Sequence, residues 1–250
     1  MYQKERIDNI TEILKKNGYV TVKYLTEELH YSTATINRDL NYMQKQRLIK
    51  RSYGGVELLK RKYVPLVFRY NKMRTAKNLI AKEAAKHIQD GDTVFFDGST
   101  TTQYISKYIT EKKNLTVITT NMALASFLSE YGITVILTGG KIVESPYILG
   151  GEDAVENAMK YNVDKFFFST GATTSDAKAY TSGYTYLLFN IMIENSKESF
   201  YLADHAKLIN ETPKTAKVLC SPDKITHYIT DFSYPDEIKK KYPNTDFIEV

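Results

Sequence analysis

The sequence predicts a small, basic N-terminal domain of three helices and a β-hairpin, followed by a larger α/β domain with a mainly parallel sheet. Helical and strand-like segments alternate regularly only after about residue 76. The excess positive charge is confined to the N-terminal segment. Residues 1–62 carry 13 Lys and Arg against 7 Asp and Glu, whereas the remainder carries 21 against 22. This asymmetry indicates a nucleic-acid-facing module; a basic face that is only solvated is the alternative.

Composition excludes several classes of protein. Hydrophobic residues make up 42% of the 250 residues and charged residues 25%, which is ordinary for a globular chain. No stretch approaches the roughly 18 apolar residues of a membrane span, and the charged N-terminus lacks the apolar core of a signal peptide. We therefore expect a cytoplasmic protein. The single cysteine, Cys220, excludes an internal disulfide, and the dispersed histidines lack metal-ligand spacing, so we expect no metal and no cofactor.

Three helices are expected within the first 46 residues. Apolar residues at helical spacing predict the first, which ends at the Asn-Gly pair 17–18. After a strand-like YVTV, two leucines four apart predict a short second helix within 22–29. Ser32 is a natural N-cap for the third helix. The inner face of this third helix is apolar and carries Ile36, Leu40 and Met43.

The third helix and the residues after it have the chemistry of a DNA-binding surface. Short polar side chains and one arginine face outward where a helix would enter the major groove: Thr33, Thr35, Asn37 and Arg38. Residues 47–59, RLIKRSYGGVELL, alternate apolar and basic residues up to a Gly-Gly and predict a two-stranded wing. A merely solvated helix face is the alternative, and the adjacent wing and local charge favour DNA binding.

The remainder predicts a linker and an α/β domain. Residues 61–75 are basic, contain Pro65 and show no clear period, so we expect a linker between domains at 1–60 and 76–250. Strand and helix then alternate five times, which indicates a mainly parallel sheet flanked by helices. The expected helices are 78–88, 101–109, 122–131, 154–161 and 187–196. The expected strands are 92–97, 115–120, 133–138, 165–170, 199–204, 217–220 and 227–230.

One loop of the second domain is suited to an anion. FDGSTTT follows a strand and opens a helix, so backbone N–H groups and the hydroxyls of Ser99, Thr100 and Thr101 come together, with Asp97 placed to hold a hydroxyl. Simple helix capping by Ser and Thr is the alternative. The segment ILTGGK at 136–141 lacks the spacing of a P-loop, so a nucleotide triphosphatase is not expected.

Residues 5–58 resemble the DeoR-type winged helix-turn-helix, whose hallmarks are a Ser-x-x-Thr-Ile-Arg-Arg-Asp-Leu recognition helix and an Arg-x-Gly-Gly wing. This chain has STATINRDL at 32–40 and RSYGG at 51–55. The resemblance implies a set of DNA-binding residues: Ser32, Thr33, Thr35, Asn37, Arg38, Arg51, Tyr53, Gly54 and Gly55. Asn37 stands where the family usually has Arg, and Tyr53 where it often has His, so we expect a different operator sequence.

Residues 75–250 resemble the DeoR C-terminal sensor domain, which shares the fold of ribose-5-phosphate isomerase and coenzyme A transferases and typically binds a phosphorylated sugar or related metabolite. The matching elements are D-x-x-T-T-T at 97–102, TTN at 119–121, TGG at 138–140, Gly150, FFFSTG at 166–171 and LADHAK at 202–207. The resemblance implies an effector pocket with Asp97 and Lys207 as its polar ends. Its residues would be Asp97, Ser99, Thr100, Thr101, Asn121, Gly139, Gly140, Gly171, Asp204 and Lys207.

Two departures from the sensor-domain pattern bear on the effector. Ser99 stands where the family commonly has Gly, and TYLLFNIM at 185–192 replaces a stretch that usually reads Glu-Ala-x-x-Lys-Arg-x-Met, so a charged pair is missing. The resemblance nevertheless predicts a homo-oligomeric repressor of carbohydrate genes, a dimer or tetramer, that binds double-stranded operator DNA and is controlled by a phosphorylated metabolite. The rival is a sugar-phosphate isomerase or acyl transferase, for which Asp97, Asp204 and Lys207 would supply a base and a cation.

Overall fold

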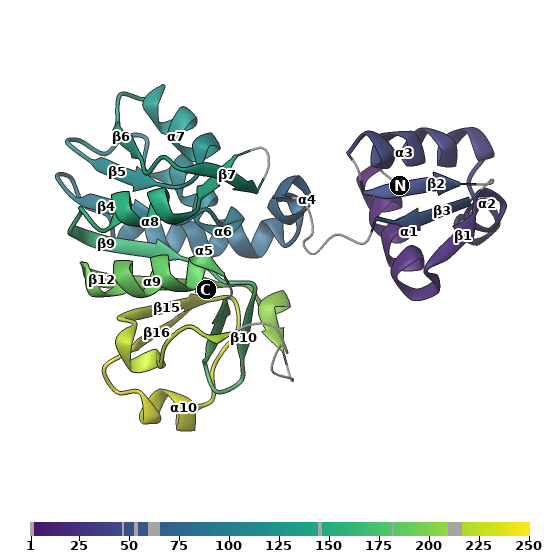
Figure 1. The fold of residues 1–250 in the computed structure, drawn as a ribbon. Helices are drawn as coiled ribbons and strands as arrows, with labels where there is room; N and C mark the ends of the chain where they lie inside the picture. Colours follow the sequence, from purple (N-terminus) through teal and green to yellow (C-terminus); the bar gives the residue numbers. More distant parts are fainter. Residues whose placement is uncertain are drawn as a thin grey trace. The chain divides into compact units, whose positions relative to one another are not determined.

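The structure is a computed structural model that describes residues 3–46, 48–52, 55–59, 66–144, 147–181, 183–209 and 217–250. The chain divides into two compact units, Met1–Pro65 and Leu66–Val250 (Figure 1). The division falls inside the stretch that the sequence predicts as a linker.

The first unit consists of three helices and a three-stranded antiparallel sheet of order β1-β3-β2. Its elements are α1 (Gln3–Asn17), β1 (Tyr19–Thr21), α2 (Val22–Leu29), α3 (Thr33–Lys45), β2 (Ile49–Ser52) and β3 (Gly55–Leu58). The expected helices and hairpin are therefore confirmed. Gly18, with a φ of +74°, ends α1, and its N–H donates to the carbonyl of Leu14 at 2.9 Å. Ile36, Leu40 and Met43 of α3 are completely buried.

The predicted linker is partly wrong, because much of residues 66–75 is helical. Helix α4 spans Leu66–Asn71, and α5 spans Arg74–Lys86. The ring of Tyr70 stacks on the ring of Tyr104 with 4.8 Å between centroids, and the Tyr104 hydroxyl donates to the carbonyl of Tyr70 at 2.9 Å. This tertiary contact fixes a helix too short to show a sequence period. Residues 60–65, which include Pro65, lie outside the described part of the chain.

The second unit is built on a seven-stranded sheet in which every described pairing is parallel (Figure 1). The strands are β4 (Thr93–Phe96), β5 (Thr116–Thr119), β6 (Thr134–Leu137), β9 (Val163–Phe168), β12 (Ser196–Ala203), β15 (His227–Thr230) and β16 (Asp246–Glu249). Their order is β16-β15-β12-β9-β4-β5-β6. The chain therefore runs outward from β4 in one direction and then from β9 in the other. In such sheets ligands bind beyond the carboxyl ends of the strands at this switch point.

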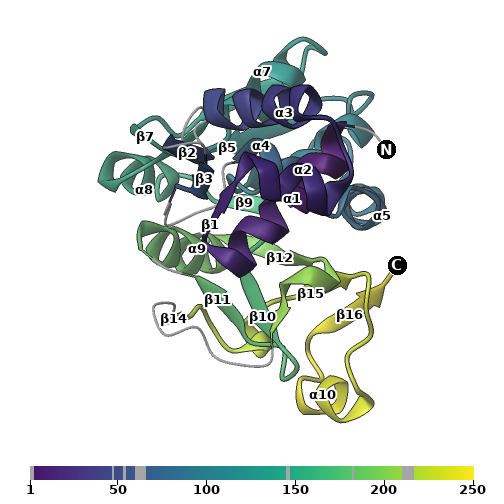
Figure 2. The ribbon, with the colours of Figure 1, turned by 90° about the vertical axis from the view of Figure 1, so that its right-hand side faces the viewer.

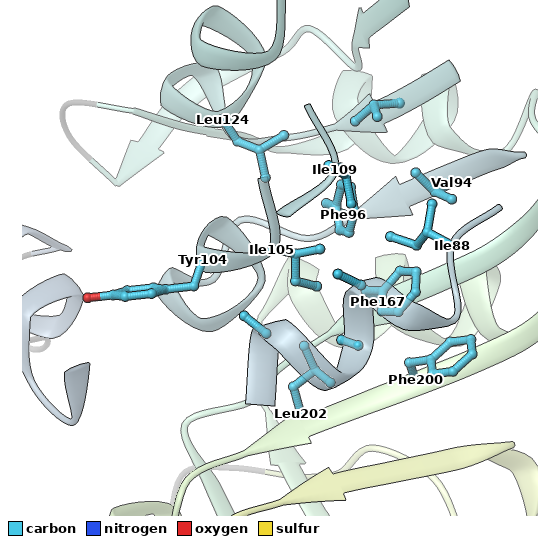
Figure 3. Close-up of a cluster of buried hydrophobic side chains, with 14 of the residues drawn as sticks. Ile88, Val94, Phe96, Tyr104, Ile105, Ile109, Leu124, Phe167, Phe200 and Leu202 are labelled. Atoms are coloured by element: carbon cyan, nitrogen blue, oxygen red, sulfur yellow. The ribbon is translucent and has the colours of Figure 1, made fainter. Parts of the chain in front are cut away.

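Helices cover both faces of this sheet, so side chains alternate between two cores. Phe96, Phe167 and Phe200 point into a core with α5 and α7 (Met122–Ser129), shown in Figure 3. Phe95 and Phe166 point into the opposite core with α8 (Glu152–Ala158) and α9 (Tyr184–Glu194). The predicted α/β class with a mainly parallel sheet and flanking helices is confirmed.

Several shorter elements differ from the sequence prediction, although β14 (Lys217–Val218) lies within the expected strand 217–220. Residues 101–109, expected as one helix, form α6 (Thr100–Gln103) and a 3₁₀ helix η1 (Tyr104–Tyr108). An antiparallel hairpin, β7 (Lys141–Glu144) and β8 (Ile148–Gly150), follows β6. A small sheet of order β13-β10-β11-β14 comprises Leu208–Ile209, Ala172–Thr174, Ala179–Thr181 and Lys217–Val218, and β10 lies near β15 in Figures 1 and 2. The remaining elements are η2 (His205–Lys207), η3 (Pro222–Lys224) and α10 (Asp236–Lys241).

Candidate DNA-binding surface and effector site

The first turn of α3 is fixed by its own hydroxyls. Ser32 is the N-cap, as the sequence predicts, and its Oγ accepts from the backbone N–H of Thr35 at 3.3 Å. The hydroxyls of Ser32 and Thr35 are 3.0 Å apart. Thr33 and Arg38 are exposed on the same helix. The predicted contact residues therefore divide into a capping pair that orders the helix and side chains that are free to extend from it.

A hydrogen-bonded triad joins the wing to the recognition helix. The guanidinium of Arg51, on β2, donates to Asn37 Oδ1 at 2.5 Å and to Asn41 Oδ1 at 2.8 Å. Asn37 and Asn41 lie one turn apart on α3, so both amides face the same strand. Asn41 was not predicted, although its spacing of four from Asn37 was a usable signal. Because Asn37 and Arg51 share a hydrogen bond, a substitution of either residue changes the surroundings of the other.

Asp39, in the middle of the STATINRDL motif, is a structural residue. It is completely buried, and its carboxylate accepts two bonds from the guanidinium of Arg6 on α1, at 2.7 and 3.1 Å. The amide of Gln3 donates to the same carboxylate at 3.1 Å. This ion pair fixes α3 on α1 and so orients the exposed face of α3.

Of the two glycines predicted in the wing, the structure describes Gly55. A Cβ at Gly55 would lie 2.1 Å from the hydroxyl of the exposed Tyr19 side chain, so a larger residue at this position would require the Tyr19 ring to move. Tyr53 and Gly54, both predicted to contact DNA, lie outside the described residues.

Several of the predicted effector residues meet at the switch point between β4 and β9. Asp97 follows β4 and Ser169 follows β9, and the backbone N–H of Ser169 donates to Asp97 Oδ2 at 3.2 Å. Asp97 Oδ1 also accepts from Thr102 Oγ1 at 2.7 Å and from the N–H of Ser99 at 3.1 Å. Burial raises the pKa of Asp97, and these bonds oppose the rise. The carboxylate thus holds the loop together.

Two more of the predicted polar side chains cap helices. Ser99 Oγ accepts from the N–H of Thr102 at 3.2 Å at the start of α6. Asn121 Oδ1 accepts from the N–H groups of Ala123 and Leu124 at 3.0 and 3.1 Å at the start of α7. Because α6 is only four residues long, its dipole contributes little to anion binding. Positive side chains must therefore supply most of the attraction for an anion at this site.

Two lysines converge on the threonines of α6. Lys207 Nζ donates to Thr101 Oγ1 at 3.0 Å and to the Ser169 hydroxyl, and it lies 4.0 Å from Asp204 Oδ2. Lys77 Nζ, on α5, donates to Thr100 Oγ1 at 3.1 Å. Lys77 is 4% exposed, and no carboxylate in the described part of the chain lies within 4.0 Å of its ammonium.

The surroundings depress the basicity of both lysines. Burial, followed by the charge of Lys207, lowers the pKa of Lys77 to about 8. Burial also lowers the pKa of Lys207, although the charges of Asp204 and Asp97 oppose this effect. Two like charges held close together in a buried site lower the stability of the folded protein, and a bound anion would offset this loss.

Lys77 is the residue that the sequence analysis missed. It lies one residue before the predicted helix 78–88 and within the observed α5, three and four residues before Ile80 and Ala81, which are completely buried. A lysine on the apolar stripe of an amphipathic helix is an exception to the usual pattern. That exception was the available signal.

The three predicted glycines, Gly139, Gly140 and Gly171, differ in backbone conformation and surroundings. Gly140 has a φ of +93°, and a Cβ there would lie 2.6 Å from the carbonyl oxygen of Gly150, which explains the glycine by backbone geometry. Gly139 also has a positive φ, +72°, and Gly171 is exposed, with open space around its Cα. No bond from these three residues to either lysine is described.

A cavity of about 380 Å³ lies at the amino ends of β4, β9 and β12 and contains none of the predicted site residues. No group of three or more His, Cys, Asp or Glu in the described ranges is arranged to hold a metal ion. None of the helices described is long and apolar enough to cross a membrane.

Family models match both units of the chain. The DeoR-like helix-turn-helix domain matches residues 6–62, and the DeoR C terminal sensor domain matches residues 72–232. Among curated proteins, the chain is 33% identical over 211 residues to the HTH-type transcriptional repressor GlcR of Bacillus subtilis (strain 168), covering 83% of this chain and 81% of that protein. It is 28% identical over 263 residues to the lactose phosphotransferase system repressor of Staphylococcus aureus (strain NCTC 8325 / PS 47), covering 100% and 99%.

Two solved structures are similar at low sequence identity. eIF2B delta from Chaetomium thermophilum matches 80% of this chain and 64% of its own, with a TM-score of 0.50 and 14% identity. Ribose 5-phosphate isomerase from Plasmodium falciparum matches 55% of this chain and 54% of its own, with a TM-score of 0.40 and 16% identity. At such identities the likeness concerns the fold alone.

Proposed function

The chain belongs to the DeoR family of transcriptional regulators, and from this premise we propose that it is a repressor of carbohydrate-metabolism genes whose DNA binding is controlled by a phosphorylated sugar or related metabolite. The single observation that carries the effector half is the pair of buried lysines, Lys77 and Lys207, beside the hydroxyls of Thr100 and Thr101. A phosphate group supplies negative charge for both lysines, of which Lys77 has no carboxylate within 4.0 Å in the described part of the chain. Both relatives named above are called repressors, and one is named for a phosphotransferase system.

The DNA-binding half rests on α3 and the wing. Exposed Thr33 and Arg38, together with the Arg51–Asn37–Asn41 triad, place donors where base edges and phosphates lie when a helix enters the major groove. We propose a homo-oligomer, a dimer or tetramer, because two symmetric copies match paired half-sites. The regulator would act in the cytoplasm on double-stranded operator DNA.

The rival, an enzyme of the isomerase or acyl-transferase type, is disfavoured by the state of Asp97. A general base needs a carboxylate within reach of a substrate proton. The Asp97 carboxylate instead accepts three bonds from its own loop and from Ser169. Turnover of ribose 5-phosphate that Asp204→Ala abolished would reverse this assignment.

Mobility shifts with the full-length protein test the DNA-binding half. The promoter region of the chain's own gene is compared with random DNA at moderate salt. The variant Arg38→Ala, which removes one exposed charge from α3, is measured on the same two DNAs. We expect a preference for the promoter DNA that Arg38→Ala weakens. Equal binding to both DNAs would contradict the proposal.

A thermal-shift screen against phosphorylated sugars tests the effector half, because a ligand that binds only the folded protein raises its melting temperature. The unphosphorylated sugars serve as controls. A ligand found in this way should also change the mobility shift. Stabilisation by neither class of compound would remove the effector from the proposal.

A further inference from the structure

The C-terminal end of α4 is bonded to residues of the predicted effector site. The carbonyl of Arg69 accepts from Lys77 Nζ and, at 3.4 Å, from Thr100 Oγ1. The next carbonyl, that of Tyr70, accepts from the Tyr104 hydroxyl at 2.9 Å. Tyr104 is a buried member of the hydrophobic core, and Figure 3 shows its hydroxyl pointing away from the other labelled residues. Three side chains of the second unit thus hold one end of a six-residue helix.

Two of these three side chains are groups that an anion would use. Lys77 and Thr100 are both 4% exposed, and a neutral backbone oxygen occupies their donors. The charged groups that act on Lys77 are Lys207, Asp204, Arg69 and Lys72, so three cations and one carboxylate surround it. The Arg69 carbonyl and the Thr100 hydroxyl accept hydrogen bonds from the Lys77 ammonium but, being neutral, leave its charge uncompensated.

We propose that Lys77 is a ligand of the effector anion and that the anion replaces the Arg69 carbonyl on Lys77 and Thr100, so that effector binding releases the end of α4. This inference rests on the proposed function, in which the site takes a phosphorylated metabolite. A phosphate oxygen forms a charge-assisted bond with an ammonium that is stronger than the bond with a neutral carbonyl. The exchange therefore favours the anion.

Release of α4 has a consequence for regulation. Along the chain, α4 is the first described helix after the DNA-binding unit. A released α4 lengthens the segment that tethers this unit to the sensor unit, and longer, looser tethers reduce the effective concentration of one bound copy at the second half-site. Operator affinity then falls when the effector is bound.

Hydrogen exchange of the full-length protein tests the release directly, with inorganic phosphate as the probe and chloride at matched ionic strength as the control. We expect amides of residues 66–71 to exchange faster in phosphate. Half of this change should be reached at the phosphate concentration that gives half of the thermal stabilisation. Unchanged or slower exchange of this segment in saturating phosphate would overturn the release.

Lys77→Gln removes the charge and should weaken phosphate binding by at least about tenfold, with residues 66–71 already exchanging fast without phosphate. Lys82→Gln is the matched control, because Lys82 lies on the same helix and is exposed. Equal phosphate affinity in the two variants would exclude Lys77 as a ligand.

Tyr104→Phe tests the competition without touching the lysines, and it keeps the ring that stacks on Tyr70. It removes one bond that holds α4, so phosphate should bind more tightly, by about 2- to 10-fold. Tyr108→Phe, on the same 3₁₀ helix, is the control and should leave the affinity unchanged. Unchanged or weaker binding by Tyr104→Phe would show that α4 does not compete with the anion.

The outcomes separate the two proposals. If phosphate stabilises the protein but leaves both the exchange of residues 66–71 and the Tyr104→Phe affinity unchanged, the release of α4 is wrong and the effector site stands. If neither phosphate nor any phosphorylated sugar stabilises the protein, the proposed effector site is wrong, and the release is wrong with it.

Discussion

Two buried ionisable residues of the candidate effector site, Lys77 and Asp97, differ in how far the protein itself compensates their charge. Asp97 accepts three hydrogen bonds from the loop that it organises. Lys77 has only neutral acceptors, the Arg69 carbonyl and the Thr100 hydroxyl. The uncompensated residue is the one on which an incoming ligand has the larger effect.

The affinity for a phosphorylated sugar found in the thermal-shift screen is expected to fall by up to about tenfold between pH 7 and pH 9. The pKa of Lys77 is lowered to about 8, so its ammonium loses the proton within this range. The phosphate monoester keeps its charge, because its second pKa is about 6. Calorimetric titration at each pH measures this dependence, and Lys77→Gln should show a flatter profile. The same steep profile in Lys77→Gln would assign the titration to another group.

Asn37 and Arg51 are expected to act on DNA as one unit. A double-mutant cycle with Asn37→Ala and Arg51→Ala should give a coupling energy of about 1 kcal/mol in operator binding. Either substitution removes the hydrogen bond of 2.5 Å that the two side chains share. Thr33→Ala with Arg51→Ala is the comparison pair, for which additive effects are expected. Additivity in both cycles would show that the bond has no role in the complex.

At the scale of elements, short helices and turns are held by specific atoms. Ser32, Ser99 and Asn121 cap α3, α6 and α7. The hairpin β7–β8 lies against the loop after β4, where a Cβ at Gly98 would be 2.6 Å from a side-chain carbon of Ile148. The glycine at position 98 is explained by this close approach of β8 to the loop.

Gly140→Ala is expected to lower the free energy of unfolding by about 2–4 kcal/mol, because the new Cβ meets the carbonyl of Gly150 at 2.6 Å and the φ of +93° is strained for alanine. Gly132→Ala has a similar positive φ of +75° but open space around it, so about 1 kcal/mol is expected. Urea unfolding of both variants measures the difference. Equal destabilisation would mean that the contact with Gly150 relaxes without cost.

At the scale of the whole molecule, charge is divided between two units. The excess of Lys and Arg lies in residues 1–62, within the first unit, and the second carries nearly balanced charge. This separation keeps the electrostatic attraction for DNA in the unit that carries α3 and the wing. The anion recognition proposed for the second unit relies instead on two buried lysines, Lys77 and Lys207.

Operator binding is expected to weaken at least tenfold between about 50 and 200 mM salt, since cations that neutralise phosphates release counterions. Arg38→Ala should reduce the slope of log affinity against log salt by about one for each copy bound. Mobility shifts over a salt series measure both quantities. An affinity independent of salt would be inconsistent with the basic unit as the DNA-binding surface.

The sequence by itself determined the three N-terminal helices, the hairpin, the α/β class and the position of the loop after β4. These features depend on local signals, namely apolar periodicity, a capping serine at Ser32 and the Gly-Gly of the wing, which act within a few residues. The same locality explains why α4 and the β7–β8 hairpin were missed: each is too short to show a period.

Only the tertiary structure decided which polar side chains of the candidate sites already have hydrogen-bond partners within the protein and which carry uncompensated charge. Asp97 and Asn121 are satisfied by neighbouring backbone groups, whereas Lys77 and Lys207 come together from α5 and η2, 130 positions apart by their numbers. The order of the strands brings these segments to one edge of the sheet. Burial and the proximity of charges depend on that order, so no local pattern in the sequence contains them.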